Sequence, residues 1–143
     1  MLVNKIMSQP VVTVTLDDTL RVVKDIFEQA KFHHLLVVEE GKLYGVVSDR
    51  DLLKSISPFI GTVQAKAQDK FTLNKRVHQI MSRKPITLNP SADVYEAISL
   101  FNLHNISCIP IVNENDSPVG IVSWRDILHI IEVNHNKKLQ QTK

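Results

Sequence analysis

The sequence contains little of several residue types that mark particular classes of protein. It has one cysteine, one tryptophan and four glycines among 143 residues. The single cysteine, Cys108, cannot form a disulfide within the chain, which is typical of a protein of the reducing cytoplasm. The longest uninterrupted apolar run is residues 35–38, so we expect no transmembrane helix. Residues 1–9 lack the apolar centre of a signal peptide.

Neither sign of charge dominates the sequence. Seventeen Lys and Arg residues against fifteen Asp and Glu residues leave a net charge of +2. Nucleic-acid-binding domains usually carry a clustered basic stripe, so we expect neither a nucleic acid nor a membrane as partner. The six histidines show no zinc-site spacing, and no nucleophile motif, Walker loop or dinucleotide fingerprint is present. We therefore expect no bound metal and no enzymatic activity.

An internal repeat organises the chain. Residues 6–8, Ile-Met-Ser, recur at 80–82, an offset of 74. At an offset of 75, Gly-Val-Val-Ser-Asp-Arg-Asp (45–51) matches Gly-Ile-Val-Ser-Trp-Arg-Asp (120–126). Each copy is small for an independent domain, so the two are expected to share an apolar interface. The predicted segments are a first repeat at 1–56, a linker at 57–77, a second repeat at 78–131 and a polar, frayed tail at 132–143.

Each repeat is predicted to form strand, helix, strand, strand and helix, which makes the fold class α+β. The opening strands are short and rich in β-branched residues, and apolar residues recur behind them at helical spacing. Two apolar runs follow, separated by residues with turn chemistry, which predicts a hairpin. The predicted opening strands are 11–14 and 86–88, the hairpins pair 35–38 with 44–47 and 109–112 with 119–122, and the closing helices begin at Ser48 and Ser123.

The repeated string Gly-h-h-Ser-x-x-Asp (h is apolar), between a hairpin strand and a helix, resembles the cystathionine-β-synthase (CBS) domain family. Together with the repeated Ile-Met-Ser, the resemblance covers residues 1–56 and 78–131 as a tandem pair. It implies two βαββα repeats packed about a pseudo-twofold axis, with two clefts between them. It also implies a regulatory ligand containing adenosine, such as AMP, ADP, ATP or S-adenosylmethionine. A homodimer that senses this ligand in the cytoplasm, acting as a stand-alone module on an unidentified target protein, is the expected form.

Two Ser-x-x-Asp turns are the first candidate binding elements. Ser48 with Asp51, and Ser123 with Asp126, have the spacing of a helix capping box. The same residues could instead bind a nucleotide, because a serine hydroxyl can donate to a phosphate and an aspartate can accept both hydroxyls of a ribose. The two interpretations use one geometry, and the family resemblance favours ligand binding.

Three further residues flank these turns. Arg50 and Arg125 precede the aspartates and could either bind a phosphate or extend into solvent. Trp124, which takes the place of Asp49 in the first repeat, could stack on a base, but aromatic residues at dimer interfaces favour an interface role.

The resemblance places the adenine pocket at the first strand and at the start of the second. Ordinary strand packing is the alternative for these residues, and Cys108 is expected to be buried and inert. Two histidines in the first repeat replace small residues and are expected to reshape its cleft, so that the two sites differ. The pocket residues are Thr13, Val14, Thr15, His33 and His34 in the first repeat and Thr87, Leu88, Asn89, Ser107, Cys108 and Pro110 in the second.

A second function is compatible with the same sequence. If side chains such as His33, His34 and Leu36 fill the cleft, the protein is a structural homodimerisation module with no nucleotide ligand.

Overall fold

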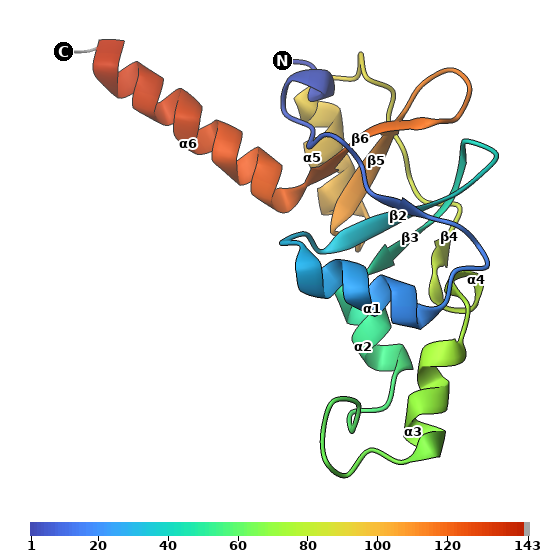
Figure 1. Cartoon of the computed structure of the whole chain (residues 1–143). Coiled ribbons are helices and arrows are strands. Elements are labelled where there is room, and N and C mark those ends of the chain that lie inside the picture. The colour runs from blue at the N-terminus through green and yellow to red at the C-terminus, as the bar shows by residue number, and fades with distance from the viewer. Residues whose placement is uncertain (142–143) are drawn as a thin grey trace. The chain divides into compact units, whose positions relative to one another are not determined.

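The structure is a computed structural model that describes residues 1–141, and it divides into two compact units (Figure 1). Unit 1 contains Met1–Val11 and residues 86–141, and unit 2 contains Val12–Pro85. These units do not follow the sequence repeats. Residues 6–8 belong to the unit built around the second repeat's hairpin, and residues 80–82 belong to the unit built around the first. Each unit therefore combines one repeat's hairpin with the other repeat's opening segment.

Unit 2 contains a four-stranded sheet in the order β1-β2-β3-β4. Strand β1 pairs with β2 in parallel, and the remaining pairs are antiparallel. The elements are β1 (Thr13–Val14), α1 (Leu20–Gln29), β2 (His34–Glu39), β3 (Lys42–Ser48), α2 (Asp49–Ser55), α3 (Ala67–Phe71), a 3-10 turn at Thr72–Asn74, α4 (Val77–Ile80) and β4 (Ser82–Arg83).

The core of unit 2 forms where α1 covers the sheet. Leu20 and Val23 lie one turn apart on α1 and are fully buried. They join Leu35 and Val47 from β2 and β3 in one apolar cluster. The predicted hairpin is confirmed, because Glu40 and Gly41 both have positive φ values (50° and 78°), as a two-residue turn with the twist of paired strands requires.

Unit 1 has a two-stranded antiparallel sheet flanked by helices. Its elements are a 3-10 turn at Val3–Lys5, α5 (Val94–Leu103), β5 (Cys108–Val112), β6 (Pro118–Ser123) and α6 (Trp124–Gln141). Val3 is fully buried in the same apolar cluster as Ala97, Ile109 and Val122, so the first residues of the chain are part of this core. The amide of Val3 donates to the carbonyl of Ala92 at 2.8 Å, which anchors the N-terminal segment beside α5 (Figure 1).

The predicted α+β class is confirmed, but two element predictions are wrong. The expected strand at 86–88 is reduced to one parallel bridge, Leu88 with Ile111. The tail is helical rather than frayed, because α6 continues to Gln141; residues 142–143 lie outside the described part. No glycine or proline interrupts 124–141, and extending an existing helix costs little once its first turns are packed.

The segment between the repeats belongs to unit 2. Within it, the Ser57 amide donates to Oγ1 of Thr72 (3.0 Å) and the Ser57 hydroxyl to Oδ1 of Asp69 (2.8 Å), whereas the Lys75 carbonyl joins it to α1 by accepting the Leu20 amide at 2.9 Å. Leu73 is buried in unit 2 and Val63 is 98% exposed. Among residues 1–141, no helix combines the length and apolar character needed to cross a membrane.

Candidate functional site

The Ser48 turn forms the capping box that its spacing predicts. Ser48 ends β3 in an extended conformation, and α2 begins at the next residue. The Asp51 amide donates to Ser48 Oγ at 3.0 Å, and the Ser48 amide donates to Asp51 Oδ2 at 2.9 Å. Within residues 1–141, no hydrogen bond reaches Asp51 Oδ1. The carboxylate therefore caps the helix with one oxygen and keeps the other available.

The Ser123 turn repeats this arrangement with one addition. The Ser123 amide donates to Asp126 Oδ2 at 2.8 Å, and the Asp126 amide donates to Ser123 Oγ at 3.4 Å. The Ser123 hydroxyl also donates to Oδ2 at 3.2 Å. The second oxygen, Oδ1, accepts the hydroxyl of Ser8 at 3.1 Å. Both carboxylate oxygens of Asp126 thus accept hydrogen bonds, whereas the described residues donate to one oxygen of Asp51.

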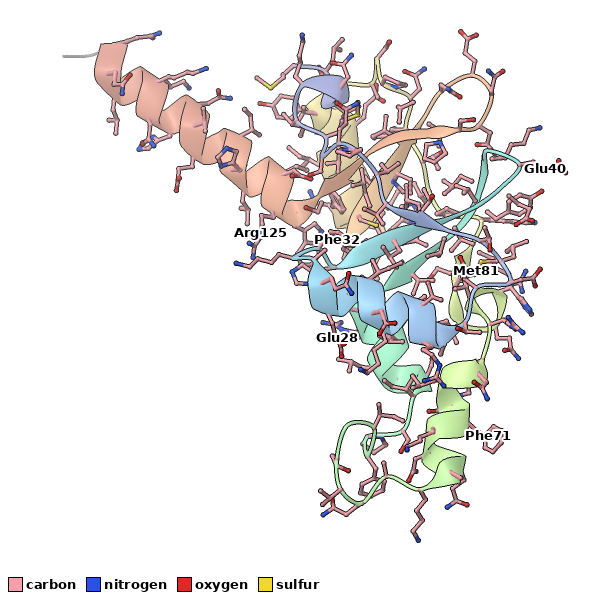
Figure 2. The ribbon with its side chains drawn as sticks, in the orientation of Figure 1. Glu28, Phe32, Glu40, Phe71, Met81 and Arg125 are labelled. Atoms are coloured by element: carbon pink, nitrogen blue, oxygen red, sulfur yellow. The ribbon has the colours of Figure 1, made fainter. Side chains whose placement is uncertain are left out.

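The two arginines that precede the aspartates are exposed on the first turns of α2 and α6. Within residues 1–141, neither Arg50 nor Arg125 forms a hydrogen bond or ion pair; Figure 2 labels Arg125 near the start of α6.

Trp124 packs on α5. Its ring meets the ring of Phe101 edge to face, with 6.3 Å between ring centroids, and it remains 56% exposed. It lines an open, mostly apolar groove of about 330 Å³ between α5 and α6. The other lining residues are Ile98, Phe101, Asn102, Ile127 and Leu128.

Of the predicted adenine-pocket residues of unit 2, some could contact a ligand through the side chain and one only through its backbone. Val14 is 3% exposed in the core, so only its backbone can meet a ligand, whereas Thr13 and Thr15 expose their side chains. The Thr15 amide donates to Asp18 Oδ2 at 2.8 Å, which shapes the turn after β1. Thr13 lies opposite Leu36 of β2, beside the start of that strand.

The two histidines of unit 2 adjoin the Ser48 turn. His33 Nδ1 lies 2.8 Å from Asp49 Oδ2, and the Asp49 amide donates to the His33 carbonyl at 3.0 Å. His34 begins β2 opposite Ser48, and burial lowers the pKa of its imidazole, an effect that the charges of Asp49 and Asp51 partly oppose. The histidines, Ser48 and Asp51 thus lie at one end of the hairpin.

The pocket residues of unit 1 are mostly part of the sheet. Cys108 and Pro110 of β5 are buried, so the expected burial of Cys108 is confirmed. The Leu88 amide donates to the carbonyl of Pro110 at 3.2 Å, and Asn89 Oδ1 accepts the amide of Ser91 at 2.6 Å. Thr87 is half-buried and Ser107 is exposed. Ser107 precedes β5, which pairs Cys108 with Ser123.

Local sequence patterns did not identify Met7, Ser8 and Met81, which the structure brings close to the two glycine motifs. A Cβ at Gly120 would collide with the side chain of Met7, and one at Gly45 would lie 2.7 Å from Sδ of Met81. Figure 2 labels Met81. Ser8 follows Met7 and reaches Asp126. The sequence does contain a sign of this packing, because Ile-Met-Ser recurs at an offset of 74 and the glycine motif at nearly the same offset, 75. No local pattern shows, however, that an Ile-Met-Ser segment packs on a glycine motif.

Within residues 1–141, no three His, Cys, Asp or Glu side chains are placed to hold a metal ion.

Comparison with known proteins identifies both repeats. The CBS domain family model matches residues 3–58 and 77–133. A CBS domain-containing protein of Dictyostelium discoideum is 33% identical over 132 residues, which cover 91% of this chain and 90% of the relative. The chain spans only 36–47% of three uncharacterized relatives from Methanocaldococcus jannaschii.

Solved structures show the same fold. A CBS domain pair in complex with 5′-methylthioadenosine and S-adenosyl-L-methionine matches with a TM-score of 0.73 and 28% identity, over 94% of this chain and 98% of that one. The cytosolic domain of the Mg²⁺ channel MgtE in complex with ATP matches with a TM-score of 0.67 and 27% identity, over 87% of this chain and 46% of that one. The chain therefore belongs to the CBS domain family and carries two CBS domains in tandem.

Proposed function

We propose that this protein is a regulatory CBS-pair module, not an enzyme, that binds an adenosine-containing ligand at its Ser-x-x-Asp turns. The observation that carries the proposal is Oδ1 of half-buried Asp51, a carboxylate oxygen that the cap holds in place and that accepts no hydrogen bond from residues 1–141. The relatives crystallised with S-adenosylmethionine, 5′-methylthioadenosine or ATP support the ligand class. AMP and ADP share the adenosine group and belong to the same proposal.

Each part of the ligand has a matching group. A ribose diol presents two donors, which a carboxylate accepts, so Asp51 and Asp126 are assigned to the ribose. Arg50 and Arg125, both exposed and unpaired within residues 1–141, are assigned to a phosphate, which binds guanidinium through charge-assisted hydrogen bonds. The hydroxyl of Ser48 is assigned to the same phosphate, and so is that of Ser123, which must first leave Asp126 Oδ2. The adenine is assigned to Thr13, Val14, Thr15, His33 and His34 in unit 2 and to Thr87, Leu88, Asn89, Ser107, Cys108 and Pro110 in unit 1.

Occupancy would act by shifting the module between conformations, which requires the ligand to prefer one of them. We place the module in the cytoplasm as a homodimer that reports adenine-nucleotide levels, and thus cellular energy, to a target protein. These features rest on the family and not on a contact in this chain.

Calorimetric titration with AMP, ADP, ATP, S-adenosylmethionine and GTP tests the ligand class. Adenosine ligands should bind and GTP should not. Asp51→Ala should lower the affinity at least about tenfold, because a hydrogen bond to a charged group contributes about 1.5–3 kcal/mol.

Asp69→Ala is the matched control for Asp51→Ala. Asp69 also caps a helix in unit 2, and its Oδ2 accepts the Lys66 amide at 2.8 Å. Asp126→Ala should likewise lower the affinity of the second turn. Its control is Asp93→Ala, because Asp93 Oδ1 accepts the Tyr95 amide at 2.8 Å at the start of α5. Equal losses of affinity in Asp51→Ala and Asp69→Ala would show that the cap, and not a ribose contact, was measured.

The groove at Trp124 favours the second candidate function, a structural homodimerisation module without a nucleotide ligand. Leu128 in this groove is 67% exposed, and exposed apolar surface of this kind marks interfaces. Light scattering with Leu128→Asp, and with Val63→Asp as an exposed control, tests it. A dimer that is lost only in Leu128→Asp and ignores every nucleotide would establish this alternative.

A further inference from the structure

The N-terminal segment is tied to β6 beside the second aspartate turn. We call residues 6–9 the strap. The Ser8 amide donates to the Ile121 carbonyl at 2.8 Å, and the Ile121 amide donates back to the Ser8 carbonyl at 3.3 Å. Gln9 Nε2 donates to the Val119 carbonyl at 3.0 Å, and Met7 fills the space over Gly120. The strap therefore has a defined register on β6, which places the Ser8 hydroxyl at Asp126.

Unit 2 has the same pairing without the side-chain bond. Ser82 lies opposite Val46 on β3, as Ser8 lies opposite Ile121 on β6. Within residues 1–141, no hydrogen bond joins the Ser82 hydroxyl to Asp51. The two turns thus share the Ser-x-Arg-Asp sequence, the cap and the neighbouring strand, but in the described part of the chain the second oxygen accepts a protein hydroxyl at Asp126 and not at Asp51.

We propose that Ser8 is an internal competitor for the ribose at Asp126, and that it makes the two turns unequal in affinity. This inference rests on the proposed function. A ribose diol can donate to both carboxylate oxygens, and at Asp126 one of its hydroxyls competes with the Ser8 hydroxyl for Oδ1. At Asp51 it meets no such competitor. Asp51 is then the tighter site, and binding at Asp126 releases part of the strap.

The expected change in ligand affinity at the Asp126 turn follows from the loss of one hydrogen bond. The Ser8 bond to Asp126 is given the net value of an ordinary intramolecular hydrogen bond, because both Ser8 and the ribose can bond to water when they are separated. Removing the competitor should raise the affinity of the Asp126 turn about three- to tenfold. By linkage, ligand at Asp126 weakens the strap by the same factor.

The test isolates the Asp126 turn. AMP and S-adenosylmethionine are titrated into Asp51→Asn, in which the amide oxygen can still accept the Ser48 amide and keep the cap. Ser8→Ala is then added to this variant, with Ser82→Ala added separately as the matched control. We expect a three- to tenfold gain with Ser8→Ala and none with Ser82→Ala.

A second measurement follows the strap itself. Amide hydrogen exchange at Ile121, whose N–H bonds to the Ser8 carbonyl, should become faster when AMP or S-adenosylmethionine binds to Asp51→Asn. In the Asp51→Asn/Ser8→Ala variant, binding should no longer change this rate.

The outcomes separate the two proposals. Binding that is unchanged or weaker in Ser8→Ala, or an equal gain in Ser82→Ala, overturns this inference and leaves the proposed function standing. If no probe binds to the wild type or to any variant, the proposed function fails, and this inference with it.

Discussion

Gly45→Ala tests why the Gly-h-h-Ser-x-x-Asp motif begins with glycine. Gly45 lies in β3 between Val37 of β2 and Arg83 of β4. A Cβ at this position would lie 2.7 Å from Met81 Sδ and 2.7 Å from the carbonyl oxygen of Ser82. The methionine can rotate away, but the carbonyl belongs to the backbone of β4. An alanine must therefore push β4 away from β3.

Two opposing contributions set the change in the free energy of unfolding caused by Gly45→Ala. Overpacking in a well-packed region costs about 1–3 kcal/mol. Alanine also reduces the entropy of the unfolded chain, which returns about 0.4–1 kcal/mol. We expect Gly45→Ala to lower the free energy of unfolding by about 1–2 kcal/mol. For a chain of this size, that corresponds to a fall of about 4–8 °C in Tm.

Urea unfolding of four variants provides the assay. The nearest atoms to a Cβ at Gly120 all belong to the side chain of Met7, so Met7→Ala should relieve most of the strain of Gly120→Ala. Met81→Ala should relieve only part of the strain of Gly45→Ala, because the Ser82 carbonyl remains. If Gly45→Ala unfolds within 0.5 kcal/mol of the wild type, or if Met81→Ala restores it fully, the close approach of β4 is not what requires glycine.

Three further predictions concern stability. Glu40 has a φ of 50° in a turn that favours Asn-Gly, so Glu40→Asn (Figure 2) should stabilise the protein by about 0.5–1 kcal/mol in urea unfolding, and a loss would contradict this. Burial lowers the pKa of His34 below 6.5, so the unfolded chain takes up its proton first and stability should fall as the pH drops below 6.5. His34→Gln should flatten that decline in thermal melts, and identical slopes would refute the assignment. Leu35→Ala removes a fully buried side chain and should cost about 2–5 kcal/mol, whereas Leu53→Ala, 71% exposed, should cost little.

Much of the fold follows from local patterns in the sequence. The alternation of apolar runs with turn residues predicted both hairpins, and β2–β3 and β5–β6 lie where expected. Ser48 and Ser123 were expected to begin helices, and both do, because a serine hydroxyl satisfies amides that the first turn leaves unpaired. The spacing of Ser48 and Asp51 also predicted the reciprocal cap. These features depend on residues close together in the chain.

The two wrong element predictions also relied on local patterns. β-Branched residues alone do not make a strand at 86–88, because within residues 1–141 Leu88 is the one residue of this segment that pairs with the sheet. The end of α6 was not predicted because the residues after Asn134 are polar. Apolar residues recur at helical spacing where a helix buries one face, and this part of α6 is exposed.

The arrangement around the candidate site was decided by tertiary structure alone. The sequence by itself determined the two repeats, their hairpins and the Ser-x-x-Asp caps. It did not show that Met7 lies over Gly120 or that Ser8 reaches Asp126, 118 residues later in the chain. Local propensities act over a few residues, whereas these contacts depend on which strand edge receives the N-terminal segment. That choice makes two turns of nearly identical sequence chemically different.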